Sequence, residues 1–129
     1  MSIVVKFPGG KKVDAHIDNH IVKSDQPVMA GGDDSAPSPF MIFLGSLANC
    51  AGIFALSFCQ QRGIDTEGLK LEVETEFDRT KGMISKIITN ITLPPNFPEK
   101  YNNAIKKSVE LCAVKRHLSS EIKTEINIV

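Results

Sequence analysis

One segment of this chain limits the possible folds more than any other, because it is apolar almost all round. It covers residues 40–59, and no charged residue follows it until Arg62. Ser38 and Pro39 ahead of it favour the N-cap and the first position of a helix, and Gly63 after it favours a helix end. A helix that is hydrophobic on all sides is either the buried central helix of a globular fold or a membrane span.

Several features of the segment favour the buried central helix over the membrane span. It contains the polar residues Ser46, Asn49 and Ser57 and the glycines Gly45 and Gly52, and its flanks have no second hydrophobic stretch. We therefore expect no membrane as a partner. A single domain of 129 residues has little surface with which to cover such a helix on every side. The segment thus predicts an obligate homodimer that covers the remaining face.

The rest of the chain alternates between extended and helical patterns. Alternation of apolar and polar residues predicts strands at residues 3–7, 13–17, 21–23, 69–77, 84–93 and 122–128. Residues 24–37 are expected to form a loop, and residues 79–82 turn the fourth and fifth strands into a long hairpin.

A second helix is expected to begin at Pro98, with a further helical turn at residues 115–119. Tyr101, Ile105, Ser108 and Cys112 follow its inward-facing rhythm, so Cys112 is expected to point into the core. The element order is N-terminal strands, buried central helix, long hairpin, second helix and terminal strand. This order predicts an α+β fold with one domain over residues 1–129.

Composition excludes several classes of function. Fifteen basic and fifteen acidic residues cancel and are spread along the chain, so no nucleic acid partner is expected. Three cysteines without a CxxC motif, and without histidines at ligand spacing, indicate neither a disulfide scaffold nor a metal site. The first residues do not resemble a signal peptide, so we expect a cytoplasmic protein. In that compartment a cysteine pair is more often catalytic or redox-active than structural.

The spacing of the cysteines separates their possible roles. Cys50 lies midway along the apolar helix and Cys112 on an inward helix face, so these two can meet in the core. Cys59 leaves the opposite face of the first helix, roughly 13 Å along its axis from Cys50, whereas a disulfide needs Cα atoms within about 7 Å. Cys59 is therefore expected to be a small buried hydrophobe.

Whether Cys50 is reactive depends on a nearby positive charge. A thiol in apolar surroundings has a raised pKa and is inert, so Cys50 can equally be a packing residue. The candidate cations are Lys6, Lys11, Lys12, Lys23, His16, His20 and Arg116. Among them we favour Lys6, His16 and Lys23.

Two motifs resemble a known family. The motif that leads into the reactive cysteine of the OsmC/Ohr family is similar to Gly31 to Pro39 followed by Leu44, Leu47, Ala48 and Cys50. The second-cysteine segment of that family is similar to Glu110 to Val114 with Leu118. The resemblance spans residues 31–128, and the order of strands and helices agrees with the family fold.

The resemblance implies an intertwined homodimer with active sites at the subunit interface. It implies a thiol peroxidase that reduces organic hydroperoxides, with Cys50 as the attacking thiolate and Cys112 as its disulfide partner. No bound cofactor is implied, because an external dithiol such as a lipoyl protein restores the thiols. A small hydrophobic hydroperoxide would be held by the apolar side chains Phe40, Met41, Phe43, Leu47 and Phe54.

The sequence also departs from the family pattern. Peroxidases of the family place an arginine from the N-terminal strands beside the reactive cysteine and hold it with a glutamate, but this chain has no arginine before Arg62 and no acidic residue in 39–44. Ala113 stands where many relatives have proline. An alternative function is therefore a non-catalytic or redox-sensing protein of the same fold that binds an apolar ligand.

Overall fold

The apolar segment forms one long helix, α1 (Pro39–Gln60), in the computed structural model of the chain. The backbone N–H of Met41 donates to the Ser38 hydroxyl over 3.5 Å, which confirms Ser38 as the residue that begins the helix. Gly63 ends it with a left-handed φ of 63°, and the N–H of Ile64 donates to the Cys59 carbonyl over 3.0 Å. The limits predicted from the sequence are confirmed to within one residue.

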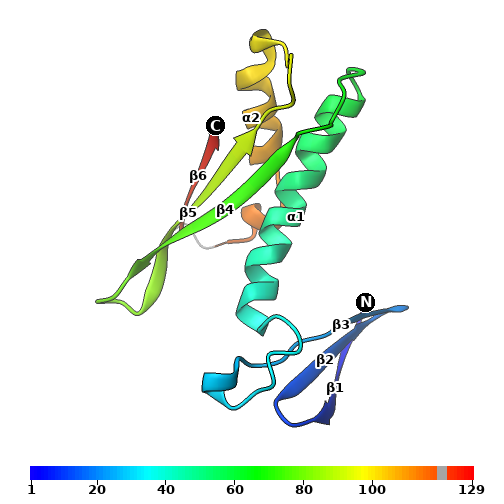
Figure 1. Cartoon of the computed structure of the whole chain (residues 1–129), viewed down its shortest axis with the longest axis vertical. Helices are drawn as coiled ribbons and strands as arrows, with labels where there is room; N and C mark the ends of the chain where they lie inside the picture. Colours follow the sequence, from blue (N-terminus) through cyan, green and yellow to red (C-terminus); the bar gives the residue numbers. More distant parts are fainter. Residues whose placement is uncertain (119–121) are drawn as a thin grey trace. The chain divides into compact units, whose positions relative to one another are not determined.

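The structure describes residues 1–118 and 122–129, and its strands and helices form an α+β fold, as predicted (Figure 1). The element order is β1 (Ile3–Gly9), β2 (Lys12–Ile17), β3 (His20–Val22), η1 (Val28–Ala30), α1, β4 (Lys70–Asp78), β5 (Met83–Thr92), η2 (Glu99–Tyr101), α2 (Asn102–Glu110), α3 (Ala113–Arg116) and β6 (Lys123–Ile128). The chain divides into two compact units, residues 1–45 and 46–129. The expectation of a single domain stays a prediction.

The unit formed by residues 1–45 is a three-stranded antiparallel sheet followed by a loop. Strands β1, β2 and β3 pair in sequence order, and Asp18, with a φ of 49°, turns β2 into β3. The only buried residues of this unit are Ser24 and Asp25, both polar. Large apolar side chains such as Ile3 and Phe7 are exposed on its surface. The unit therefore has no apolar core of its own.

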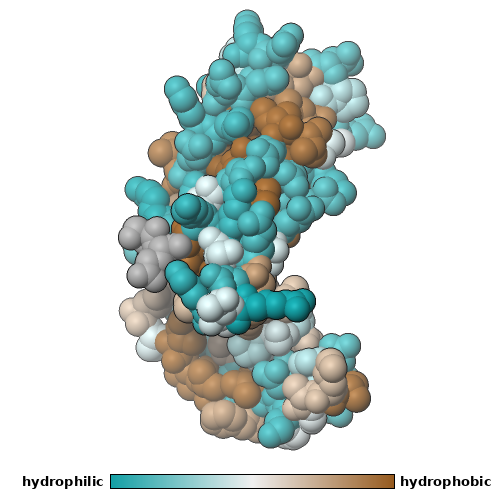
Figure 2. Space-filling model, turned by 90° about the vertical axis from the view of Figure 1, so that its left-hand side faces the viewer, coloured by the Kyte–Doolittle hydropathy of each residue, from teal (hydrophilic) through white to brown (hydrophobic). Residues whose placement is uncertain are grey.

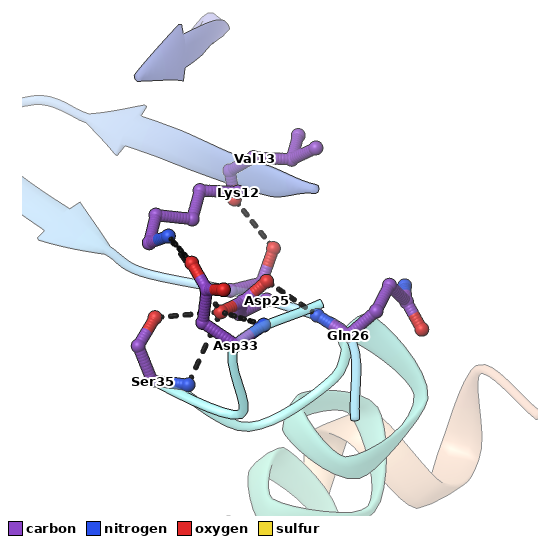
Figure 3. A network of polar contacts seen from close by, with 7 residues as sticks. Lys12, Val13, Asp25, Gln26, Asp33 and Ser35 are labelled. Atoms are coloured by element: carbon purple, nitrogen blue, oxygen red, sulfur yellow. Dashed lines mark hydrogen bonds and ion pairs between the residues drawn. The ribbon is translucent and has the colours of Figure 1, made fainter. Parts of the chain in front are cut away.

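A buried carboxylate organises the loop that follows the sheet (Figure 3). Asp25 is 1% exposed and accepts hydrogen bonds from the backbone N–H groups of Gln26, Asp33 and Ser35 and from the Ser35 hydroxyl. The hydroxyl and these N–H groups lower the pKa of Asp25 to about 2, although burial opposes them. The loop thus closes around a charged centre.

Gly32 allows this loop to close. A Cβ added there would lie 1.9 Å from the Gln26 carbonyl oxygen, so the two stretches of backbone approach too closely for any side chain. Lys12 from β2 pairs with the Asp33 carboxylate at the loop surface and lies 4.0 Å from that of Asp25. The loop predicted for residues 24–37 is therefore an ordered structure tied to the sheet.

The unit formed by residues 46–129 contains the apolar core. Strands β4 and β5 form the predicted antiparallel hairpin, and β6 pairs with β5 in parallel. Alternate residues of β5 face the helices, and Ile87, Thr89 and Ile91 are buried there as their spacing predicts. The core joins α1, α2 and the sheet through Ala51, Ala55, Phe58, Cys59, Ile91, Ile105, Val109 and Ile126.

The second helix differs from its prediction in two ways. It opens with the short 3₁₀ turn η2, and α2 begins only at Asn102. The helix also ends at Glu110, so Cys112 lies just beyond it in the break before α3 rather than on the helix itself, and it is buried as predicted. The further helical turn is α3, which ends at Arg116; Ser119, in its predicted range, lies outside the described residues.

Helix α1 is long and apolar enough to cross a membrane when judged by length and composition alone. Its buried residues, which include Leu47, Ala51 and Ala55, line one face, and this face packs against the sheet and α2. Core helices of globular proteins pass the same test of length and composition, so the test gives little support to a span. The expectation that no membrane is involved stays a prediction.

Candidate functional site

The two cysteines singled out by their motifs meet in the unit formed by residues 46–129. Cys50 lies midway along α1 and is half-buried, whereas Cys112 is buried at the residue that precedes α3. The Cys112 thiol donates a hydrogen bond to the Cys50 sulfur. The site is therefore a pair of reduced thiols in direct contact.

The environment of Cys50 favours its thiolate form. Burial alone would raise the pKa of Cys50, but hydrogen bonds from the Cys112 thiol and from the backbone N–H groups of Val114 and Ala113 stabilise the anion. The positive charge of Arg116 acts in the same direction. Together these groups outweigh burial, and the pKa of Cys50 lies below its ordinary value.

The same contact has the opposite effect on Cys112. Burial raises the pKa of Cys112, and the hydrogen bond donated to Cys50 and the negative charge there raise it further. The N–H groups of Lys115 and Val114 oppose this shift but do not reverse it. The pair therefore consists of a Cys50 thiol that ionises more readily than an ordinary cysteine and a Cys112 thiol that ionises less readily. A thiolate is the nucleophilic form of cysteine, so Cys50 is the more nucleophilic thiol of the pair.

Cys59 takes no part in this arrangement. It is completely buried in the apolar core, and burial raises its pKa, against which Arg62 acts only weakly. An inert thiol packed as a small hydrophobe is what the helix spacing predicts.

The match to a protein family covers most of the chain. Residues 32–127 match the OsmC-like protein family, and this range contains both cysteines of the pair. The chain belongs to the OsmC-like family. This membership confirms the resemblance stated from the two cysteine motifs.

Solved structures of OsmC-like proteins share the fold. A candidate osmotic stress induced and detoxification response protein from Psychrobacter arcticus 273-4 superposes with a TM-score of 0.83 at 22% identity, covering 100% of this chain and 96% of that one. An OsmC-like protein from Mycoplasma pneumoniae gives 0.77 at 18% identity, with 99% and 94% covered. The organic hydroperoxide resistance protein OhrB of Bacillus subtilis gives 0.63 at 14% identity, with 100% and 98% covered. No curated protein matches this chain.

Among the described residues, Arg116 is the cation whose charge lowers the pKa of Cys50 at the OsmC-like site. Arg116 is one of the seven candidate cations, and the preference for Lys6, His16 and Lys23 stays a prediction. Arg116 and two backbone N–H groups, all from α3, act on Cys50. Backbone donors carry no side-chain signature, so sequence reasoning missed them. The proline that many relatives have at the position of Ala113 was the available signal, because proline favours the first position of a helix.

The apolar residues expected to hold a substrate lie in different surroundings. Phe40 and Met41 are exposed at the start of α1, and the rings of Phe40 and Phe43 stack with centroids 5.8 Å apart. Leu47 is buried and lines a cavity of about 20 Å³ together with Cys112. Phe54 lines a separate groove of about 620 Å³ between α1 and α2. Leu47 and Phe54 thus line different spaces, and of these two the Leu47 cavity is the one that a cysteine of the pair also lines.

No metal centre is present in the part of the chain that the structure describes, because no three His, Cys, Asp or Glu side chains gather there closely enough to bind an ion. The chemistry available at the site is that of the two thiols, the α3 amides and Arg116.

Proposed function

We propose that this OsmC-like protein is a thiol-dependent peroxidase that reduces organic hydroperoxides to alcohols. The observation that supports it most is the asymmetric thiol pair, in which Cys112 donates to Cys50 and the two pKa values shift in opposite directions. A peroxidase of this type needs one thiol as an anion for attack and a second thiol that stays protonated until the first step is complete.

The first step uses both thiols. The Cys50 thiolate attacks the outer oxygen of the hydroperoxide, the O–O bond breaks, and an alkoxide leaves. The alkoxide takes the proton of Cys112 and becomes the alcohol, which leaves Cys50 as a sulfenic acid and Cys112 as a thiolate. The N–H groups of Ala113 and Val114, which stabilise the sulfur anion beforehand, become free to bind the sulfenic oxygen.

The second step forms the disulfide. The Cys112 thiolate attacks the Cys50 sulfur and displaces hydroxide, which becomes water by taking up the proton that Cys50 had released earlier. An external dithiol, such as a lipoyl protein, then reduces the bridge and is itself oxidised to a disulfide. The sum of the reaction is hydroperoxide plus dithiol to alcohol, water and disulfide. Such a cycle needs a reducing compartment, which fits the expected cytoplasmic location.

We also propose that the working form is an intertwined homodimer. The supporting observation is that residues 1–45 bury only the polar residues Ser24 and Asp25, while the apolar Ile3, Phe7 and Ile21 are exposed. A sheet of three short strands without an apolar core is not stable alone, so another surface must cover it. Apolar side chains are also visible on the molecular surface in Figure 2.

A second candidate function is a non-catalytic or redox-sensing protein that binds an apolar ligand. The absence of any arginine before Arg62 and of any acid in residues 39–44 favours it, because the arginine and glutamate of family peroxidases have no counterpart there. One experiment separates the two functions. Cumene hydroperoxide should be consumed with oxidation of an equal amount of dithiol over many turnovers, whereas a sensor would consume only one equivalent per chain and stop.

A further inference from the structure

Helix α3 carries groups that stabilise the Cys50 anion, yet it is a single turn of four residues, Ala113–Arg116. A helix this short is unstable by itself, because fixing the first turn costs more free energy than its few hydrogen bonds contribute. Cys112, at its N-cap, makes no side-chain cap hydrogen bond. The position of α3 therefore depends on contacts beyond its own backbone hydrogen bonds.

A histidine side chain contacts the backbone where the chain leaves α3. The N–H of Arg116 donates to the Cys112 carbonyl over 3.1 Å, as in an α-helix. The N–H of His117 donates instead to the Val114 carbonyl over 3.1 Å, whereas a regular α-helix would give it the Ala113 carbonyl. The His117 ring takes that place, with Nδ1 2.6 Å from the Ala113 carbonyl oxygen. Because a carbonyl oxygen can only accept, Nδ1 carries the proton and donates.

The Ala113 carbonyl belongs to the same peptide unit as the N–H of Val114. A trans peptide unit is planar, and its C=O and N–H point in opposite directions. A donor that holds the carbonyl therefore fixes the direction of the N–H, and it polarises the peptide so that the N–H becomes a stronger donor. This N–H is one of the two that stabilise the Cys50 anion, and it acts on Cys112 as well. His117 is thus linked to the thiol pair through one rigid group.

We propose that His117 is a positioning residue of the thiol site: its imidazole holds the peptide between Ala113 and Val114, so that the peptide N–H stays directed at Cys50. The inference deepens the proposed function and rests on it, because it concerns the thiol that we propose to attack hydroperoxides. Arg116 lies next to His117 in the chain, so the same contact also steadies the residue whose charge acts on Cys50. This histidine lies outside both cysteine motifs.

The test compares two side chains of the same shape at this exposed position. His117→Leu removes the donor, and leucine forms helices well, so the turn loses no intrinsic propensity. His117→Asn restores a donor, because its amide nitrogen lies as many bonds from Cα as Nδ1 does, and it carries no charge. The measurement is the rate of iodoacetamide labelling of Cys50 against pH, followed by mass spectrometry on the full chain.

His117→Leu should move the labelling profile of Cys50 to higher pH. Below the midpoint of the profile, the rate should fall roughly two- to tenfold, which is the usual effect of one hydrogen bond. His117→Asn should lie close to the wild-type profile. A merely structural role for the ring would lower the melting temperature without moving the profile, so both are measured. His117→Ala repeats the test in case an exposed leucine causes association.

The possible results separate this inference from the proposed function. A lowered wild-type profile that His117→Leu leaves in place would overturn the inference alone. A profile for His117→Asn that matches the one for His117→Leu would also overturn it, because the donor would then not be what matters. A wild-type profile at the free-cysteine value would reject both the activation of Cys50 and the role of His117. A shift in His117→Leu, reversed in His117→Asn, would support the inference even if no hydroperoxide is turned over.

Discussion

The Cys112 thiol donates a hydrogen bond to the Cys50 sulfur, and this contact lowers the pKa of Cys50 and raises that of Cys112. Both are cysteines in apolar surroundings, and burial raises the pKa of each. Two backbone N–H groups stabilise the anion at each sulfur, but only Cys50 also accepts the hydrogen bond of the other thiol and has a nearby arginine, and its pKa is lowered. The direction of one hydrogen bond therefore separates the thiol that we propose to attack from the thiol that we propose to resolve.

Alkylation of Cys50 should show an apparent pKa below the free-cysteine value of about 8.5. Because the folded pKa is lowered, the thiolate fraction should rise as pH increases through that lowered value and then level off. Arg116→Gln should shift the alkylation profile to higher pH, since it removes a charge that stabilises the anion. Iodoacetamide rates from pH 5 to 10 on a Cys59→Ser background would measure the shift.

Arg79→Gln is the control for that experiment, because Arg79 lies in the turn between β4 and β5. An unchanged profile in Arg116→Gln, together with a shift in Lys6→Gln, His16→Gln or Lys23→Gln, would restore the prediction made from the sequence. A profile centred at or above about 8.5 in the wild-type protein would mean that Cys50 is not activated and would favour the non-catalytic function.

Substitution of each pair member should have a different effect. Cys50→Ser should abolish peroxide consumption, because no thiolate remains for the first attack. Cys112→Ser should react once and leave a sulfenic acid on Cys50 that dimedone traps, with over-oxidation to sulfinic acid in competition. Mass spectrometry of the wild-type chain after one equivalent of cumene hydroperoxide should find a bridge between Cys50 and Cys112. A bridge that includes Cys59, or no bridge, would contradict the mechanism.

Cys59→Ser should retain activity and lose stability. The substitution places a hydroxyl in a fully buried apolar position, which costs about 1–3 kcal/mol in the free energy of unfolding. Urea denaturation would measure the loss, and Cys59→Ala separates the polar effect from the change in volume. An equal cost in both variants would show that packing, rather than the hydroxyl, is responsible.

Much of the fold could be predicted because its signals are local. The charge-free run up to Arg62 with its terminal glycine specifies α1, and strict alternation specifies β4 and β5. The break at Cys112 could not be found in this way, since the inward-facing rhythm of α2 continues through it. A turn of backbone between α2 and α3 interrupts the helix but returns the Cys112 side chain to the same core.

The order in the loop at residues 24–37 could not be predicted for a different reason. Pro27 and the paired glycines indicate only a loop, whereas its structure depends on Asp25, which receives hydrogen bonds from residues up to ten positions away. A carboxylate in a polar sequence gives no sign that it will be buried. The contact among Cys50, Ala113 and Val114 likewise joins segments more than 60 residues apart and consists partly of backbone groups.

Asp25 should make stability depend on acid pH. Its folded pKa of about 2 lies below the unfolded value of about 3.9, so its contribution is complete above the unfolded pKa and is lost as pH falls through about 2. Asp25→Asn should be less stable than the wild-type chain at neutral pH, and the difference should shrink between about pH 4 and pH 2. Thermal unfolding across this range would measure it.

The control for Asp25 is its exposed neighbour Asp34, which has a φ of 52° that asparagine also tolerates. Asp34→Asn should follow the wild-type curve. A gap between Asp25→Asn and wild type that stays constant with pH would mean that geometry rather than charge is responsible.

The homodimer should be visible in solution. Light scattering should give twice the chain mass of 14.1 kDa, and the melting temperature should rise with protein concentration because association is linked to folding. Phe7→Asp in the exposed β1 strand should weaken association. Lys11→Gln in the turn between β1 and β2 is the control and should leave association unchanged. A stable monomer at micromolar concentration would contradict the proposal.

The parallel pairing of β5 with β6 affects the order in which the chain can fold. The β4–β5 hairpin closes locally, with Asp78 opposite Met83, but Ile87 meets Thr124 only across 37 positions (124 minus 87). Such distant pairings form slowly, because the intervening chain must first be ordered. Cys112 lies within that crossover, so it reaches Cys50 only when the crossover docks. The topology of the sheet therefore links the contact between Cys50 and Cys112 to the packing of this crossover.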